Sequence, residues 1–165
     1  MGALTDLPDG ARACVITVSD RSFAGTRPDS SGPLLAGLLA DLGFVVDPVV
    51  VVPDEVPAIA AAVLVGAGQA DLVVTTGGTG LSPRDVTPEA VGPLLERQVP
   101  GLAESLRQCG REQVPTTILS RGVAGTIGSA LVVTLPGSTG GVRDGVRGLA
   151  PVVGHALAQL KGSDH

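Results

Sequence analysis

Aromatic side chains are almost absent from this sequence, which contains two Phe and neither Tyr nor Trp among 165 residues. Aromatic rings are the usual stacking platform for unpaired bases, and a basic face is what attracts a nucleic-acid backbone. The chain also lacks an excess of positive charge, because its formal net charge is −5. We therefore expect no nucleic-acid partner.

Cysteine and histidine are equally scarce, with two residues of each type. Cys14, Cys109, His155 and His165 are far apart and show no zinc-ligand spacing. Two cysteines are too few for a disulfide scaffold, and no Ser-His-Asp or Cys-His arrangement is recognisable. We expect neither a structural Cys/His metal site nor a disulfide framework.

Long apolar runs are missing as well. The longest ones, such as Val45–Val52, are interrupted by Asp or Pro well short of a membrane span. The first residues, MGALTDLPDGARA, lack the pattern of a secretory signal, so we expect a cytoplasmic protein without membrane association. Hydrophobic residues nevertheless make up 44% of the chain. The expected organisation is a mobile lead-in over residues 1–12 and one domain over residues 13–161.

Short apolar runs alternate with helical patterns along the chain. Strands are predicted at Ala13–Val18, Val45–Val52, Leu72–Thr75 and Ala130–Leu135. Helices are predicted from Ser30-Ser31 to Gly43, and over Val56–Val65, Thr87–Leu95, Gly101–Arg111 and Val142–Leu160. Buried strands that alternate with helices indicate parallel strands joined by βαβ crossovers. The predicted fold class is therefore α/β with a mostly parallel central sheet.

Four turns leave the carboxyl ends of the predicted strands. They are Ser19-Asp20, Pro53-Asp54, Gly77–Asp85 and Pro136–Ser138. Ligands of open parallel sheets bind at the carboxyl ends of the strands. If the strands are parallel, the four turns share one edge, where we predict the functional site.

The turn after the third strand, Thr75-Thr76-Gly77-Gly78-Thr79-Gly80, is suited to hold a phosphate. Its glycines allow positive φ and close approach of a ligand, and its N–H groups and Thr hydroxyls can hold an anion. It is neither a Walker A loop nor a GxGxxG segment. A tight turn without a ligand is the alternative. Pro136-Gly137-Ser138 precedes a helix and is a second candidate anion site.

Charged residues accompany these turns. Asp85 could hold Mg²⁺ or accept a hydrogen bond from a ligand, or it could be a solvated turn residue. Arg84 could pair with Asp85 or contact a phosphate. Asp54 could serve the site or could cap the helix that follows it, and Thr87 is expected to be an N-cap. Arg21 is a further candidate phosphate contact.

Five segments resemble the Mog/MoaB family of molybdenum cofactor biosynthesis, whose members carry a molybdopterin-binding domain. The resemblance covers nearly the whole chain, from Ala13 to Leu160. The segments are VSDRSFAG (Val18–Gly25), VPDE (Val52–Glu55), TTGGTGLSPRDVTPEA (Thr75–Ala90), SRGVAG (Ser120–Gly125) and LPGS (Leu135–Ser138).

The resemblance implies a three-layer α/β/α sandwich that forms a homotrimer. The family's adenylyltransferases join molybdopterin to the adenylyl group of ATP, with Mg²⁺, and release pyrophosphate. Partners implied for the pathway are a molybdopterin synthase and a molybdenum insertase. The family's acids match Asp54 and Asp85, which would be catalytic and hold Mg²⁺.

Substrate contacts are implied at the remaining matched positions. The loops that hold the phosphates match Thr76, Gly77, Gly78, Thr79 and Gly80, together with Pro136, Gly137 and Ser138. Ser19, Asp20 and Arg84 are also expected to contact substrate.

Two features of the sequence do not decide which activity of the family this chain shares. Gly140-Gly141 stands where some relatives carry Lys or Pro, and the LSP and PGST segments are similar to MoaB-like members. The alternatives to an adenylyltransferase are a protein that binds molybdopterin without adenylylating it and a different nucleotide-using α/β enzyme.

Overall fold

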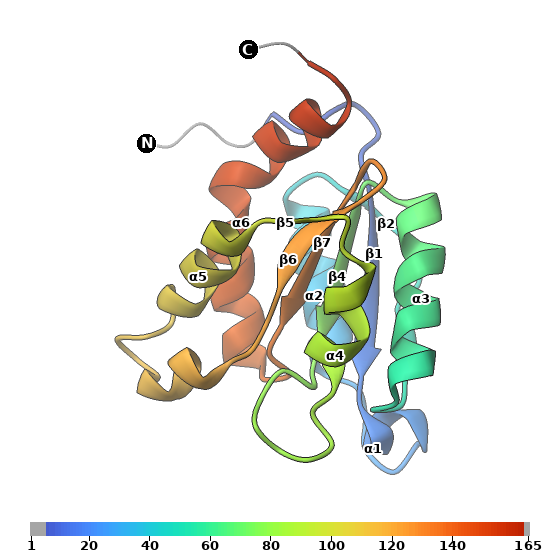
Figure 1. The fold of residues 1–165 in the computed structure, drawn as a ribbon, viewed down its shortest axis with the longest axis vertical. Coiled ribbons are helices and arrows are strands. Elements are labelled where there is room, and N and C mark those ends of the chain that lie inside the picture. Colours follow the sequence, from blue (N-terminus) through green and yellow to red (C-terminus); the bar gives the residue numbers. More distant parts are fainter. Residues whose placement is uncertain (1–5, 164–165) are drawn as a thin grey trace.

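A seven-stranded sheet forms the centre of the protein in the computed structural model, which describes residues 6–163 (Figure 1). The strands are β1 (Arg12–Val18), β2 (Val45–Val46), β3 (Val50–Val52), β4 (Leu72–Thr76), β5 (Arg97–Gln98), β6 (Ala124–Ile127) and β7 (Ala130–Leu135). Their order is β2-β1-β4-β7-β6-β5, and β3 also pairs with β1. β1, β2, β3, β4 and β7 are parallel, whereas β5 and β6 are antiparallel to their neighbours. The mostly parallel α/β sheet is confirmed.

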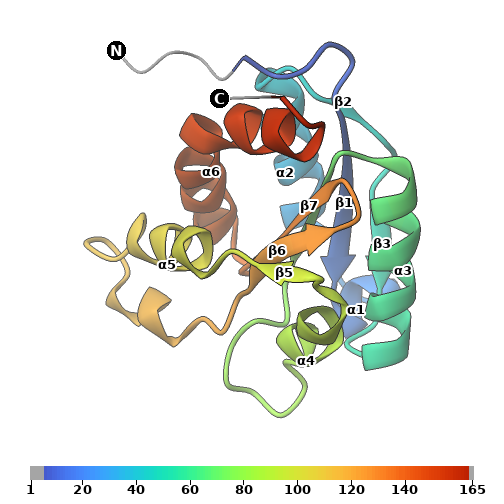
Figure 2. The same cartoon turned by 45° about the horizontal axis from the view of Figure 1, so that its top comes forward.

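Helices cover both faces of this sheet (Figure 2). They are α1 (Asp20–Phe23), α2 (Ser31–Asp41), α3 (Val56–Gln69), α4 (Thr87–Val91), α5 (Pro100–Gln108) and α6 (Thr139–Leu160), with 3₁₀ turns η1 (Gly92–Leu94) and η2 (Pro115–Leu119). α2, α5 and α6 contribute to one hydrophobic cluster, and α3 and α4 contribute to the other. The fold therefore has three layers, helices–sheet–helices.

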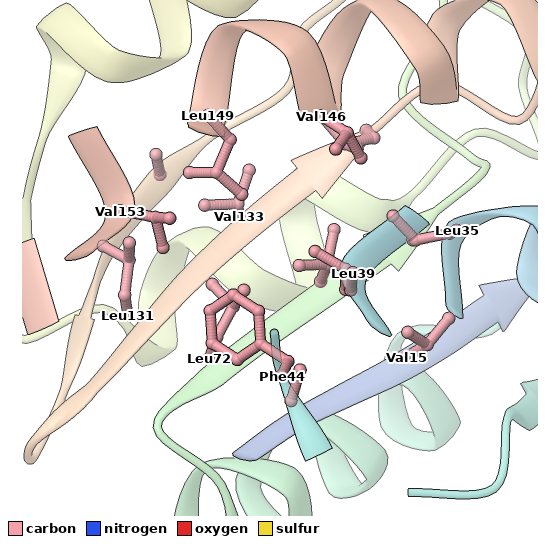
Figure 3. Close-up of a cluster of buried hydrophobic side chains, with 14 of the residues drawn as sticks. Val15, Leu35, Leu39, Phe44, Leu72, Leu131, Val133, Val146, Leu149 and Val153 are labelled. Carbon is pink, nitrogen blue, oxygen red and sulfur yellow. The ribbon is translucent and has the colours of Figure 1, made fainter. Parts of the chain in front are cut away.

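Burial on both faces explains why the strands are apolar throughout their length. Toward α2 and α6, the strands present Val15, Leu72 and Val133, which lie against helix side chains such as Leu39 and Leu149 (Figure 3). Alternate strand residues face α3 on the other side. Burying each aliphatic side chain of this size stabilises the folded state by about 1.5–3 kcal/mol. Because the central strands bury such side chains on both faces, a helix layer is needed on each side of the sheet.

Several predicted boundaries were wrong. The predicted strand Val45–Val52 is two strands, β2 and β3, because Pro48 has no N–H to donate and interrupts the ladder. The predicted helix Thr87–Leu95 ends at Val91 and continues as η1. β5 and β6 were not predicted, since β5 is a polar pair of residues and β6 includes Gly125.

The start of the first strand also differs from the expectation. Residues 1–5 of the predicted lead-in lie outside the described residues. Ala11 is already buried and Arg12 begins β1, so the folded domain starts before residue 13. Within residues 6–163, no helix is both long enough and apolar enough to cross a membrane.

The connections after β1 and β4 leave on opposite faces of the sheet. From β1 the chain passes through α2 to β3, whereas from β4 it passes to α4 on the other face. β1 and β4 are hydrogen-bonded neighbours, so a crevice opens between their carboxyl ends. α1, the turn after β4 and the start of α6 all lie at the lower end of the view in Figure 1. This is the type of position at which open α/β sheets bind ligands.

Candidate functional site

A cavity of about 580 Å³ lies at this crevice, and all four predicted turns contribute to its wall. Predicted site residues that line it are Ser19, Asp20, Asp54, Thr76, Gly77, Gly78, Arg84, Asp85, Gly137 and Ser138. The parallel arrangement therefore brings the four turns together, as the sequence predicted.

A second cavity of about 780 Å³ adjoins the first. Both are lined by Gly78, Asp85, Gly137 and Ser138, so these residues form the boundary between them. The remaining predicted site residues, Thr79, Gly80 and Pro136, line the second cavity, together with apolar side chains from Leu81, Val114 and Leu119. One cavity is bordered mainly by charged and hydroxyl groups, and the other offers an apolar surface.

The glycine-rich turn is hydrogen-bonded to the neighbouring turn, which follows β7. Gly77 and Gly78 have φ of 111° and 68°, a backbone conformation that other residues rarely adopt. The Gly77 N–H donates to the Leu135 carbonyl at 3.0 Å, and the Thr76 hydroxyl donates to the Pro136 carbonyl at 2.8 Å. The two candidate phosphate-binding turns thus form one rigid unit.

Thr87 does not cap α4, contrary to the prediction. α4 begins at Thr87 itself, with Val86 in the N-cap position. The buried Thr87 hydroxyl instead donates to the Gly77 carbonyl at 2.9 Å. Thr87 therefore stabilises the glycine-rich turn rather than the helix.

Asp20 and Asp54 connect the ends of β1 and β3 through two reciprocal hydrogen bonds. The Asp20 N–H donates to Asp54 Oδ2, and the Asp54 N–H donates to Asp20 Oδ1, both at 2.9 Å. The N-cap position of α3 is Glu55, and the Asp54 carboxylate faces the cavity, so the helix-cap alternative for Asp54 was wrong. The carboxylates that follow these two parallel strands are thereby held at the edge of the sheet.

Arg84 pairs with Asp20. Its Nε and Nη2 donate to Asp20 Oδ2 at 2.9 and 2.7 Å, although 63 residues lie between the two positions in the sequence. The Asp54 N–H and the Arg84 guanidinium together lower the pKa of Asp20. Asp20 is therefore a persistently ionised group that holds Arg84 at the cavity wall.

Asp54 has the opposite electrostatic character. Partial burial raises the pKa of its carboxyl, and the negative charges of Asp20 and Asp85 add to this effect. Carboxylates with like charges converge here, and a cation would relieve their repulsion. Among the described residues, however, no three or more His, Cys, Asp or Glu side chains are arranged as a metal site.

Asp85 is held by its neighbours in the loop and by Arg121. The Ser82 N–H donates to Asp85 Oδ2 at 3.1 Å. Arg121 Nη2 donates to the Asp85 carbonyl at 2.8 Å, and Arg121 Nε donates to the Gly80 carbonyl at 2.9 Å. Arg121 also pairs with Glu89, which lowers the pKa of that carboxyl. The sequence singled out the SRGVAG segment, but nothing in it indicated that Arg121 would position the Asp85 loop.

Ser19 and Ser138 each begin a helix at the cavity. The Ser138 hydroxyl oxygen accepts from the Gly141 N–H at 3.0 Å as the N-cap of α6, and the Ser19 oxygen accepts from the Ser22 N–H at 3.2 Å. Each hydroxyl accepts one bond and can still donate its own proton. The N-terminus of the long helix α6 also favours negative charge. Both features suit a phosphate group.

Asp54→Asn is expected to make the protein slightly more stable at neutral pH. A raised pKa in the folded state means that the folded protein binds more protons than the unfolded chain, so stability falls as pH rises from about 4 through the raised pKa. Asparagine removes this penalty and can still accept from Asp20. Solvent screening limits the gain to about 0.5 kcal/mol. Urea denaturation should show no difference from the wild type below about pH 4 and a gain at pH 7. A difference that does not change with pH would contradict this.

The fold and this site define a class of protein: a three-layer α/β protein with glycine-containing turns and carboxylates at the switch point of its sheet. A family model described as "probable molybdopterin binding domain" matches residues 14–155. The chain belongs to this family, which acts in molybdenum cofactor biosynthesis.

Similar proteins carry related names. A "molybdenum cofactor biosynthesis bifunctional protein" of Synechococcus elongatus is 44% identical over 94% of this chain and 49% of its own length. A "molybdopterin adenylyltransferase" of Helicobacter pylori is 33% identical over 90% of this chain and 87% of its own length. The solved structure of the "molybdopterin biosynthesis enzyme MoaB" from Thermus thermophilus superposes with a TM-score of 0.85, at 44% identity, over 93% of this chain and 98% of its own. The chain spans about half the length of the bifunctional relative.

Proposed function

We propose that the protein is an ATP- and Mg²⁺-dependent molybdopterin adenylyltransferase that prepares molybdopterin for molybdate insertion. The observation that carries this proposal is the junction of the two cavities, where Asp85 and the Gly78 and Gly137 backbones line both. A reaction that joins two substrates through a phosphate needs such a junction, with room for one substrate on each side. The name of the Helicobacter pylori relative agrees with this activity.

The reaction would proceed by displacement at the α-phosphorus of ATP. An oxygen of the molybdopterin phosphate forms a bond to this phosphorus, and the bond from phosphorus to the oxygen that bridges to the β-phosphate breaks. Pyrophosphate carries away the electron pair of that bond. Such a transfer relies on positioning and on charge stabilisation rather than on covalent chemistry by the protein.

Asp54 and Asp85 fit a bound Mg²⁺. Their oxygens are the hard ligands that Mg²⁺ prefers, and the ion takes few protein ligands when phosphate oxygens are present. Two carboxylates therefore suffice, even though no three-residue cluster exists among the described residues. When bound with ATP, Mg²⁺ neutralises negative charge on the phosphates. The backbones of Gly78 and Gly137 would orient the phosphates, and Ser138 would donate to one of them.

The second candidate is a MoaB-like protein that binds molybdopterin without activating it. The LSP segment before Arg84 and the PGST sequence after β7 favour this candidate, because both are similar to MoaB-like members. Either candidate would act in the cytoplasm, and the family resemblance implies that it would form a homotrimer. A molybdopterin synthase would supply the substrate and a molybdenum insertase would receive the product.

The purified protein should release pyrophosphate from ATP only when molybdopterin and Mg²⁺ are present. A coupled pyrophosphate assay, with a control that lacks molybdopterin, tests this directly. Tight molybdopterin binding without pyrophosphate release would establish the binding protein instead. Release that does not depend on molybdopterin would indicate a different nucleotide-using enzyme.

A further inference from the structure

Two arginines outside the glycine-rich turns line the first cavity. Arg21 lies in α1, directly after Asp20, and Arg27 lies in the loop that leads to α2. From the sequence we predicted Arg21 as a candidate phosphate contact, but we predicted no role for Arg27. Both are exposed to solvent at the rim, so a ligand in the cavity can reach them.

The backbone folds back so that these two residues lie next to each other. The N–H groups of Thr26 and Arg27 donate to the Arg21 carbonyl at 3.0 and 3.3 Å, and the Thr26 hydroxyl donates to the same oxygen at 3.2 Å. Gly25, with φ of 76°, allows the reversal. The loop thus places two arginine residues at one side of the cavity.

Neither guanidinium has a protein partner among residues 6–163, whereas Arg84 on the same cavity is paired with Asp20. The nearby Asp29 is also engaged, because it accepts from the Thr17 hydroxyl at 2.7 Å and from the Gly32 N–H at 3.0 Å. The acids closest to the pair in sequence are therefore already bonded. Two adjacent unpaired cations favour a ligand with more than one negative charge.

We propose that Arg21 and Arg27 bind the β- and γ-phosphates of ATP and hold the pyrophosphate as it leaves. This assignment rests on the proposed function. Asp85 and Gly78 would then lie at the α-phosphate, at the boundary of the two cavities. Because the attacking and leaving oxygens are in line, the molybdopterin phosphate would approach from the opposite side, the second cavity.

Binding of inorganic tripolyphosphate tests the assignment without molybdopterin or turnover. Calorimetry in the presence of Mg²⁺ should show binding to the wild type, and at least about tenfold weaker binding to the double variant Arg21→Ala/Arg27→Ala, since charge-assisted contacts are lost. Arg111→Ala is the matched control, because Arg111 is exposed and lies outside both cavities. Its affinity should equal that of the wild type. Equal affinity of the double variant and the control would overturn the assignment.

Kinetics separate this inference from the proposed function. In an active enzyme, the double variant should raise KM for ATP and the inhibition constant of pyrophosphate at least about tenfold, and leave KM for molybdopterin unchanged. Molybdopterin-dependent turnover with an unchanged KM for ATP would refute the arginine assignment alone. Arginine-dependent tripolyphosphate binding without any turnover would refute adenylylation alone. An unchanged thermal midpoint would show that the exposed arginines are not needed for folding.

Discussion

Asp85→Asn is expected to reduce molybdopterin-dependent pyrophosphate release by at least about a thousandfold. The carboxylate would be lost at the boundary of the two cavities, where charge develops on the transferring phosphate, and removing one stabilising group there typically costs a factor of about 10²–10³. Loss of a ligand of the proposed Mg²⁺ would add to this cost. Steady-state assays over a range of Mg²⁺ concentrations would measure it.

The fold should survive this change. Asparagine retains an oxygen that can accept from the Ser82 N–H, and Arg121 contacts the Asp85 carbonyl, which the substitution does not alter. Circular dichroism and the thermal midpoint should match those of the wild type. Asp41→Asn, at the exposed end of α2, makes the same chemical change away from the cavities and should keep full activity. If Asp85→Asn turned over like this control, the adenylyltransferase proposal would fail.

The location of the candidate site could be predicted from the sequence because topology and composition constrain it strongly. Short apolar runs such as Ala13–Val18 predict strands that are buried on both faces, and such strands are typical of parallel sheets. Parallel strands place the turns that follow them at one edge, so Asp20, Asp54 and Asp85 meet although they are distant in the chain. Local residue types and one topological rule were enough for this step.

The partners of the charged residues could not be predicted in this way. Arg84 stands beside Asp85 in the chain but pairs with Asp20, since the choice depends on where the β4 loop folds over β1. Arg121 belongs to a loop before β6, a strand that was not predicted, so its bonds to the Asp85 loop could not be foreseen. Thr87 has the sequence context of a helix cap, but its hydroxyl bonds a tertiary partner. Local patterns predict elements, whereas these contacts depend on how the elements pack.

Gly77→Ala is expected to destabilise the protein by about 3 kcal/mol and to abolish phosphate binding. Gly77 has φ of 111°, and an added Cβ would overlap the carbonyl oxygen of Val18 on the neighbouring strand. Strain at a disfavoured backbone conformation costs about 1–3 kcal/mol, and displacing the two strands adds to it. Urea denaturation would report the loss of stability, and tripolyphosphate calorimetry would report the loss of the site.

Gly128→Ala separates the two causes of the lost stability, which are backbone strain and steric overlap with β1. Gly128 also has positive φ, 57°, but an added Cβ would have no heavy atom within 4 Å. Only the conformational cost of about 1–2 kcal/mol should therefore appear there, with phosphate binding intact. The excess at Gly77 measures how closely the glycine-rich turn must approach the end of β1. That approach holds Ser19 and Asp20 against the glycine-rich turn, so equal losses for the two variants would mean that close packing there is not what builds the candidate site.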